Sequence, residues 1–192
     1  TGKDAGSERP MRANRRAATL KRMRNALTLS LLLTGPAFAG ELDVLAGRVV
    51  APIHSEACIL AVVAGHMKAT LTDAVARPTV RYASKTALSD YHADIENEYG
   101  PGSSAPYNVV TNMFLPKRNV IYMSDKAEHY RPGRYIDDSV AHEFAHYLQF
   151  FYQGEKDNPS PDYDMLETGA IKVQEWFRET YMAAGRSPCA AP

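Results

Sequence analysis

The chain has little cysteine, no excess of charge of either sign and no internal repeat or low-complexity segment. Two cysteines in 192 residues are too few for a disulfide scaffold or a cysteine-rich zinc module. The 22 basic residues balance 22 acidic ones, which argues against a basic nucleic-acid binder and against an acidic disordered tail. With 45% hydrophobic and 23% charged residues, the composition is that of a globular protein long enough to bury a core.

The first 39 residues have the pattern of a secretory signal peptide. A positively charged stretch that ends at Arg24 precedes an apolar run over 26–33, and a helix-breaking pair at 35–36 and a small-residue cleavage site at 37–39 follow. The apolar run is too short for a permanent membrane span. A buried N-terminal helix is the alternative, but the breakers and the cleavage site directly after the run favour the signal peptide.

Met23 is the nearest start for this leader, and Met11 is a second one. We expect residues 1–39 to comprise an upstream extension and the signal peptide, and residues 40–192 to form a single domain. The leader holds eight of the basic and two of the acidic residues, so the remaining 153 residues carry 14 basic and 20 acidic side chains and a net charge of −6. That charge argues against binding to nucleic acid or to an anionic membrane surface.

Export places the protein in the periplasm or outside the cell, where disulfides form. Cys58 and Cys189 are then the only intramolecular pair available, and a bond between them would tie the C-terminal tail to an early helix. The alternative is two free thiols, because sequence alone does not supply the required geometry.

The mature chain reads as an α+β domain in which helices surround a few short strands. Its hydrophobic spacing and turn residues predict a helix over 55–76 capped by Ser55, a strand over 79–82, a polar helix or loop over 84–99, strands over 107–115 and 119–123, a helix from Asp137 or Asp138 to Tyr152, and a last helix over 163–184. Pro116 to Arg118 separates the second and third strands, so these are expected to be neighbours.

The motif His142-Glu143-Phe144-Ala145-His146 lies inside a predicted helix. Residues four apart lie on one helix face, so both imidazoles can reach one Zn²⁺. Glu143 follows a ligand directly and can hold and deprotonate a water there. The apolar residues Val140, Phe144, Leu148 and Phe151 form a different stripe that can anchor the helix.

A catalytic zinc needs a third protein ligand and an open position for water. Glu167 is the best candidate because it begins the segment Glu167–Ala170 in the next predicted helix, with 20 residues between it and His146. Gly169 and Ala170 are small residues, which allows the two helices to approach closely. The other candidates are Glu175, Asp162 and Asp164. The third histidine of the H-E-x-x-H-x-x-G-x-x-H pattern is missing, because Gln149 and Tyr152 occupy the relevant positions.

These residues resemble the gluzincin metallopeptidases, the thermolysin-like and aminopeptidase-like zinc enzymes, over residues 107–184. The resemblance implies a zincin-like fold, zinc on His142, His146 and Glu167, and Glu143 as the general base. Asn112-Met113-Phe114 is similar to the family's edge strand, which implies a substrate-binding role for Asn112; an ordinary polar strand residue is the alternative.

The chain also departs from that family. Thermolysin-like members carry an acidic residue four after the glutamate ligand, where this chain has Ile171, and longer members supply an oxyanion stabiliser from a C-terminal subdomain. A stabiliser here would have to come from His129, Tyr130, Tyr135, Tyr152 or Tyr163.

The sequence thus favours an exported, monomeric zinc peptidase that acts on a peptide or protein substrate. The alternative is a zinc-containing binding or structural protein that keeps the site without turnover. The pattern does not distinguish endopeptidase from exopeptidase action.

Overall fold

The structure is a computed structural model that describes residues 47–130, 132–158 and 161–189. The predicted signal peptide lies outside the described residues. The described residues belong to one compact unit. Among the described helices, none combines the length and the apolar character that crossing a membrane requires.

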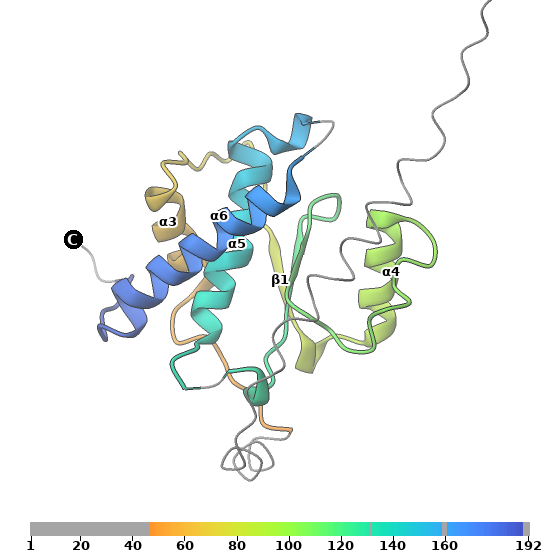
Figure 1. The fold of residues 1–192 in the computed structure, drawn as a ribbon, viewed down its shortest axis with the longest axis horizontal. Helices are drawn as coiled ribbons and strands as arrows, with labels where there is room; N and C mark the ends of the chain where they lie inside the picture. The colour runs from red at the N-terminus through yellow and green to blue at the C-terminus, as the bar shows by residue number, and fades with distance from the viewer. Residues whose placement is uncertain (1–46, 131, 159–160, 190–192) are drawn as a thin grey trace, which may run out of the picture. The chain divides into compact units, whose positions relative to one another are not determined.

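The described residues form an α+β domain, which confirms the predicted class (Figure 1). Its main elements are α3 (Glu56–His66), β1 (Thr79–Tyr82), α4 (Leu88–Tyr99), β2 (Met113–Leu115), β3 (Val120–Met123), α5 (Ile136–Tyr152) and α6 (Tyr163–Phe177). Short 3-10 turns cover Ala83–Lys85, Ala127–His129 and Glu155–Asp157, and a π-helical turn, Arg178–Met182, extends α6.

The three strands form one mixed sheet in the order β1-β3-β2. β1 runs parallel to β3, with Thr79 opposite Val120, and β2 runs antiparallel to β3, with Leu115 also opposite Val120. β2 is therefore an edge strand and the neighbour of β3, as predicted. At the turn between them Asn119 adopts a positive φ of 48°, and its Nδ2 donates to the Ala76 carbonyl at 2.9 Å.

The sheet separates two cores. α3, α5 and α6 lie on one side and α4 on the other (Figure 1). Because successive strand residues point to opposite faces, Ile121 and Met123 join the core with the three helices, whereas Val120 and Tyr122 join the core with α4. A strand that is buried on both faces needs an apolar residue at every position, and all four residues of β3 are buried.

The predicted helix over 55–76 is wrong in its second half. α3 is capped by the Ser55 side chain as predicted, but it ends at His66. Lys68 then takes a left-handed φ of 58°, which an α-helix does not accommodate. Leu71 and Val75 nevertheless pack against the core, so the apolar spacing reports burial correctly while the backbone is not helical.

The predicted strand over 107–115 is also too long, because only Met113–Leu115 is paired. The residues before it form irregular chain over α4. Val110 is buried in the core with α4, and Tyr107 packs against the same core. Side chains that are typical of strands are therefore buried here against α4, although their backbone is not paired with another strand.

Neither Asp137 nor Asp138 is the N-cap of α5, because the helix begins at Ile136 with Tyr135 as its cap. Both carboxylates lie in the first turn, where negative charge interacts favourably with the helix dipole. Asp137 is fully buried and accepts hydrogen bonds from the backbone amides of Ile53 and His54, each at 2.9 Å. The end of α5 at Tyr152 agrees with the prediction.

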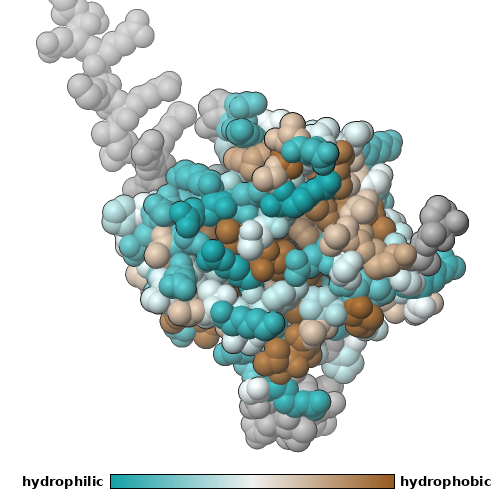
Figure 2. Space-filling model, turned by 180° about the vertical axis from the view of Figure 1, so that it is seen from behind, coloured by the Kyte–Doolittle hydropathy of each residue, from teal (hydrophilic) through white to brown (hydrophobic). Residues whose placement is uncertain are grey.

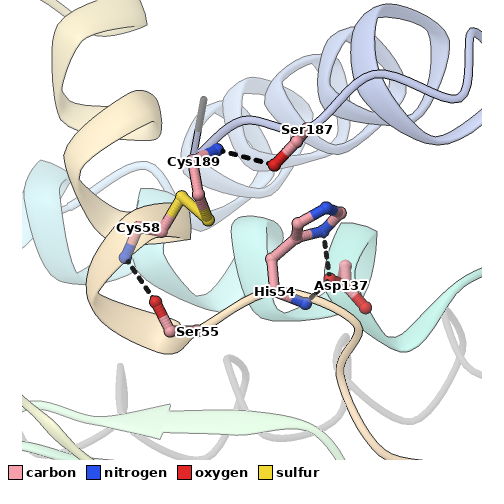
Figure 3. Close-up of a disulfide and its surroundings, with 6 residues drawn as sticks. All are labelled: His54, Ser55, Cys58, Asp137, Ser187 and Cys189. Carbon is pink, nitrogen blue, oxygen red and sulfur yellow. Dashed lines mark hydrogen bonds and ion pairs between the residues drawn. A yellow bond between two sulfur atoms is a disulfide. The ribbon is translucent and has the colours of Figure 1, made fainter. Parts of the chain in front are cut away.

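Cys58 and Cys189 form a disulfide, the pairing that the sequence suggested, with their Cα atoms 5.4 Å apart (Figure 3). The bond ties the tail beyond α6 to α3. His54 lies beside it and pairs through Nδ1 with Asp137 at 2.9 Å (Figure 3). The start of α5, the start of α3 and the C-terminal tail are thereby held together.

Apolar side chains are interspersed with hydrophilic ones on the face seen in Figure 2. Large exposed apolar side chains occur in the described chain at Val49, Ile53, Tyr99, Val109, Tyr163, Met165 and Ile171. Scattered exposure of this kind is ordinary for a folded protein.

Candidate metal site

α5 presents two different faces, as its sequence predicts. Val140, Phe144 and Leu148 are buried in the core, which fixes the helix against the sheet. His142 and His146 lie on another face, and their side chains are 13% and 22% exposed. The two imidazole Nε2 atoms are 3.1 Å apart, so both rings point at the same place.

α6 brings Glu167 to that place. The Glu167 Oε1 lies 3.4 Å from His142 Nε2, and its Oε2 lies 3.2 Å from His146 Nε2. The glutamate side chain is 55% exposed, so the cluster opens to solvent on the side of α6. In the described part of the chain, this trio is the group of side chains whose donor atoms converge closely enough to hold a metal ion.

The spacing of the donor atoms is close to that of a tetrahedral zinc site. Zinc binds imidazole nitrogen and carboxylate oxygen at about 2.0–2.2 Å, which places neighbouring donors of a tetrahedron about 3.3–3.6 Å apart. The two imidazole Nε2 atoms are 3.1 Å apart, and each lies close to one oxygen of Glu167, His142 Nε2 at 3.4 Å from Oε1 and His146 Nε2 at 3.2 Å from Oε2. Two histidines and one glutamate are also the donor types of known catalytic zinc sites. The residues present therefore fit the metal that the motif implies.

The charges in the cluster also favour a cation. Hydrogen bonds from His142 and then His146 hold the pKa of Glu167 well below its usual range. Burial lowers the pKa of His146, but the hydrogen bond to Glu167 and the carboxylates around the ring outweigh burial and shift it upward. Positive charge is thus stabilised where the three donors meet, and a metal ion can take the place of the protons.

Glu143 is buried directly beside the cluster, with 4% of its surface exposed. Burial raises the pKa of its carboxyl, while the nearby His142 and His146 and a backbone hydrogen bond from Phe114 act in the opposite direction. Phe114 belongs to the edge strand β2, so the carboxylate lies between the two histidines and that strand. A carboxylate with a raised pKa in such a place can accept and release a proton.

Gln149 is a residue of this site that the sequence analysis noted only as a departure from another motif. Its Oε1 lies 3.0 Å from His146 Nδ1, and its Nε2 donates to the Leu166 carbonyl at 2.9 Å. It therefore connects a histidine of α5 to the residue before Glu167 in α6. The available signal was its position, because residues 146 and 149 are three apart and lie on one helix face.

Other predicted site residues lie elsewhere. Glu175 is exposed and does not join the cluster, so α6 presents Glu167 to the histidines instead. Asn112 is exposed and lies just before β2, where its Oδ1 accepts from the Ser124 amide at 2.7 Å. Asp162 caps α6 by accepting from the Met165 amide at 3.2 Å.

The five candidates for an oxyanion stabiliser differ in how they are engaged. His129 and Tyr130 both bond to Ser124, and Tyr152 accepts from the Thr72 amide at 3.4 Å. Tyr135 is the cap residue of α5. Tyr163 begins α6 one turn before Glu167 and is 60% exposed.

Comparison of the chain with protein-family models, with curated proteins and with solved structures finds no match.

Proposed function

We propose that this protein is an exported zinc-dependent hydrolase of the gluzincin kind that cleaves peptide bonds. The observation that carries the proposal is the convergence of His142, His146 and Glu167 within 3.1–3.4 Å of one another, with the carboxylate of Glu143 buried beside them. The leader sequence supports export, and the α5–sheet arrangement supports a zincin-like fold.

His142, His146 and Glu167 would hold the metal. When bound, Zn²⁺ supplies a Lewis acid that polarises a carbonyl group and lowers the pKa of water toward neutrality. Glu143 accepts the proton of the attacking water and passes it to the nitrogen of the leaving group. Its burial suits the first step, because a raised pKa makes the carboxylate a stronger base.

β2 supports an extended substrate. The strand is at the edge of the sheet, and its Phe114 lies beside Glu143. The outer side of an edge strand carries backbone groups that are not paired within the sheet, and those other than the Phe114 amide, which bonds to Glu143, can pair with a peptide. Asn112 would act at the start of this strand through its backbone, because its side-chain oxygen is already bonded to Ser124.

The test is the substitution Glu143→Gln, which removes the base but keeps a side chain of the same shape. The variant is expected to bind zinc as tightly as the parent and to lose chelator-sensitive cleavage of a peptide library. A variant that cleaves as fast as the parent would falsify the mechanism. A parent that binds no zinc would remove the proposal altogether.

One observation favours a second function, a zinc-containing binding or structural protein without turnover. Three of the five candidate stabilisers bond to other parts of the chain, namely His129, Tyr130 and Tyr152. The peptide library distinguishes the two functions, since zinc binding without any chelator-sensitive cleavage would favour the binding protein.

A further inference from the structure

We propose that Gln149 is a positioning residue that sets the metal-binding tautomer of His146 and ties it to the helix that carries Glu167. The inference rests on the proposed zinc site. According to this inference, zinc affinity depends on Gln149 as well as on the three ligands, although Gln149 does not bind the metal. The inference follows from the hydrogen bonds of Gln149 with Leu166 and His146, and from the lack of space for a side chain at Gly169.

The contact with α6 fixes which way the amide of Gln149 points. The Leu166 carbonyl can only accept a hydrogen bond, so the group that faces it at 2.9 Å must be the amide nitrogen. The amide oxygen then faces the other way, toward His146 Nδ1 at 3.0 Å. Gln149 is 6% exposed, so water does not compete freely for either contact.

The orientation of the amide in turn fixes the proton on His146. An amide oxygen only accepts, so Nδ1 of His146 must carry the hydrogen. In the neutral ring Nε2 is then without a proton and presents its lone pair to the place where His142 Nε2 and Glu167 meet. Gln149 thus selects the form of His146 that binds a metal through Nε2.

Gly169 provides the space for this amide. A Cβ atom added at Gly169 would lie 2.8 Å from Gln149 Nε2, closer than such atoms approach in proteins. The amide is the end of a flexible side chain, so it could move away at small steric cost, but it would then leave Leu166 and His146. α6, which carries Glu167, therefore has a glycine two residues later, at a position where any larger residue would displace the Gln149 amide.

The experiment measures zinc affinity by competition with a chromophoric chelator for the parent, Gln149→Leu and Gly169→Ala. Both variants are expected to bind zinc about 10–100-fold more weakly than the parent, as is usual when a partner of a metal-binding histidine is removed. Gly169→Ala is the sharper variant, because alanine favours a helix over glycine by about 1 kcal/mol and the fold should not suffer.

The matched control is Gly65→Ala in α3, where a Cβ would meet no atom within 4 Å. It should leave zinc affinity unchanged. The tautomer of His146 is read independently from the long-range ¹H–¹⁵N spectrum of metal-free protein at alkaline pH, where the parent should show the proton on Nδ1 and both variants should lose this preference.

A parent that binds zinc together with a Gly169→Ala variant that binds it equally well would overturn the role of Gln149 and leave the proposed function intact. A parent with the His146 proton on Nε2 would do the same. A parent that fails to bind zinc overturns the proposed function itself.

Discussion

Arg178 donates from Nε to the Asp138 carboxylate at 2.6 Å, and this contact joins the end of α6 to the start of α5. Asp138 is fully buried, and its other oxygen accepts from Gln174 at 2.9 Å. Near the other end of the helix pair, Gln149 bonds to Leu166. α6 is therefore held antiparallel to α5 at two separate points, and Glu167 lies next to the second.

Asp138→Ala is expected to destabilise the fold by about 3 kcal/mol, the lower end of the range for breaking a buried ion pair. The value is at the lower end because the Arg178 side chain is 24% exposed and can turn to water. Chemical denaturation measures the loss. The exposed Glu179 offers the control, and Glu179→Ala should change stability by less than about 0.5 kcal/mol. Equal effects of the two substitutions would contradict the importance of this contact.

Glu167→Ala is expected to abolish stabilisation by zinc, whereas Glu175→Ala should keep it. A ligand that binds only the folded protein at one hundred times its Kd adds about 2.7 kcal/mol to the free energy of unfolding. Thermal unfolding with zinc and with a chelator measures this gain for each protein. If Glu175→Ala removed the gain and Glu167→Ala did not, the third ligand would be misassigned.

Replacing both Cys58 and Cys189 by serine is expected to lower the stability by about 2–4 kcal/mol, the usual range for a native disulfide. The two cysteines are 131 residues apart, so the bond removes a large loop-closure entropy from the unfolded chain. The proposed zinc ligands lie on α5 and α6, whereas the disulfide joins α3 to the C-terminal tail, so zinc binding by the folded variant should persist. Loss of the folded state at room temperature would show that the disulfide contributes more than this.

His66 gives a prediction on pH. Its ring stacks on Trp176 with the centroids 3.7 Å apart, and burial lowers its pKa below the ordinary 6.5. The folded state therefore binds the proton less readily than the unfolded state. The stability from this residue is complete above pH 6.5 and is lost as the pH falls toward the lowered value. His66→Phe should keep the stack and flatten the difference in stability between neutral and acidic pH. An unchanged pH profile would contradict it.

The sequence was sufficient to predict the parts of the fold that depend on the spacing of neighbouring residues along the chain. The helix with His142 and His146 ends at Tyr152 as predicted, because its apolar stripe and the following glycine are local signals. The helix over 55–76 failed because Leu71 and Val75 keep helical spacing in chain that is not helical. Buried residues can therefore recur at helical spacing in chain that is not helical.

The same limit applies to the polar residues. Asp137 and Asp138 were predicted to cap a helix because aspartate commonly does so. Their partners are His54, 83 residues before Asp137, and Arg178, 40 residues after Asp138, and no local pattern indicates them. Gln149 is a similar case, since its importance depends on where the next helix lies. Glu167 could be placed because helix, loop and returning helix have few geometric alternatives.

The disulfide between Cys58 and Cys189 closes the polypeptide into a covalent ring that contains all three strands and the helices α4, α5 and α6. One broken peptide bond inside this ring opens it but releases no fragment. If a protease cut the turn between β2 and β3, the product would migrate as one molecule on a gel without reductant and as two with it. The helices that carry His142 and Glu167 thus remain on one molecule after any single cut between the two cysteines.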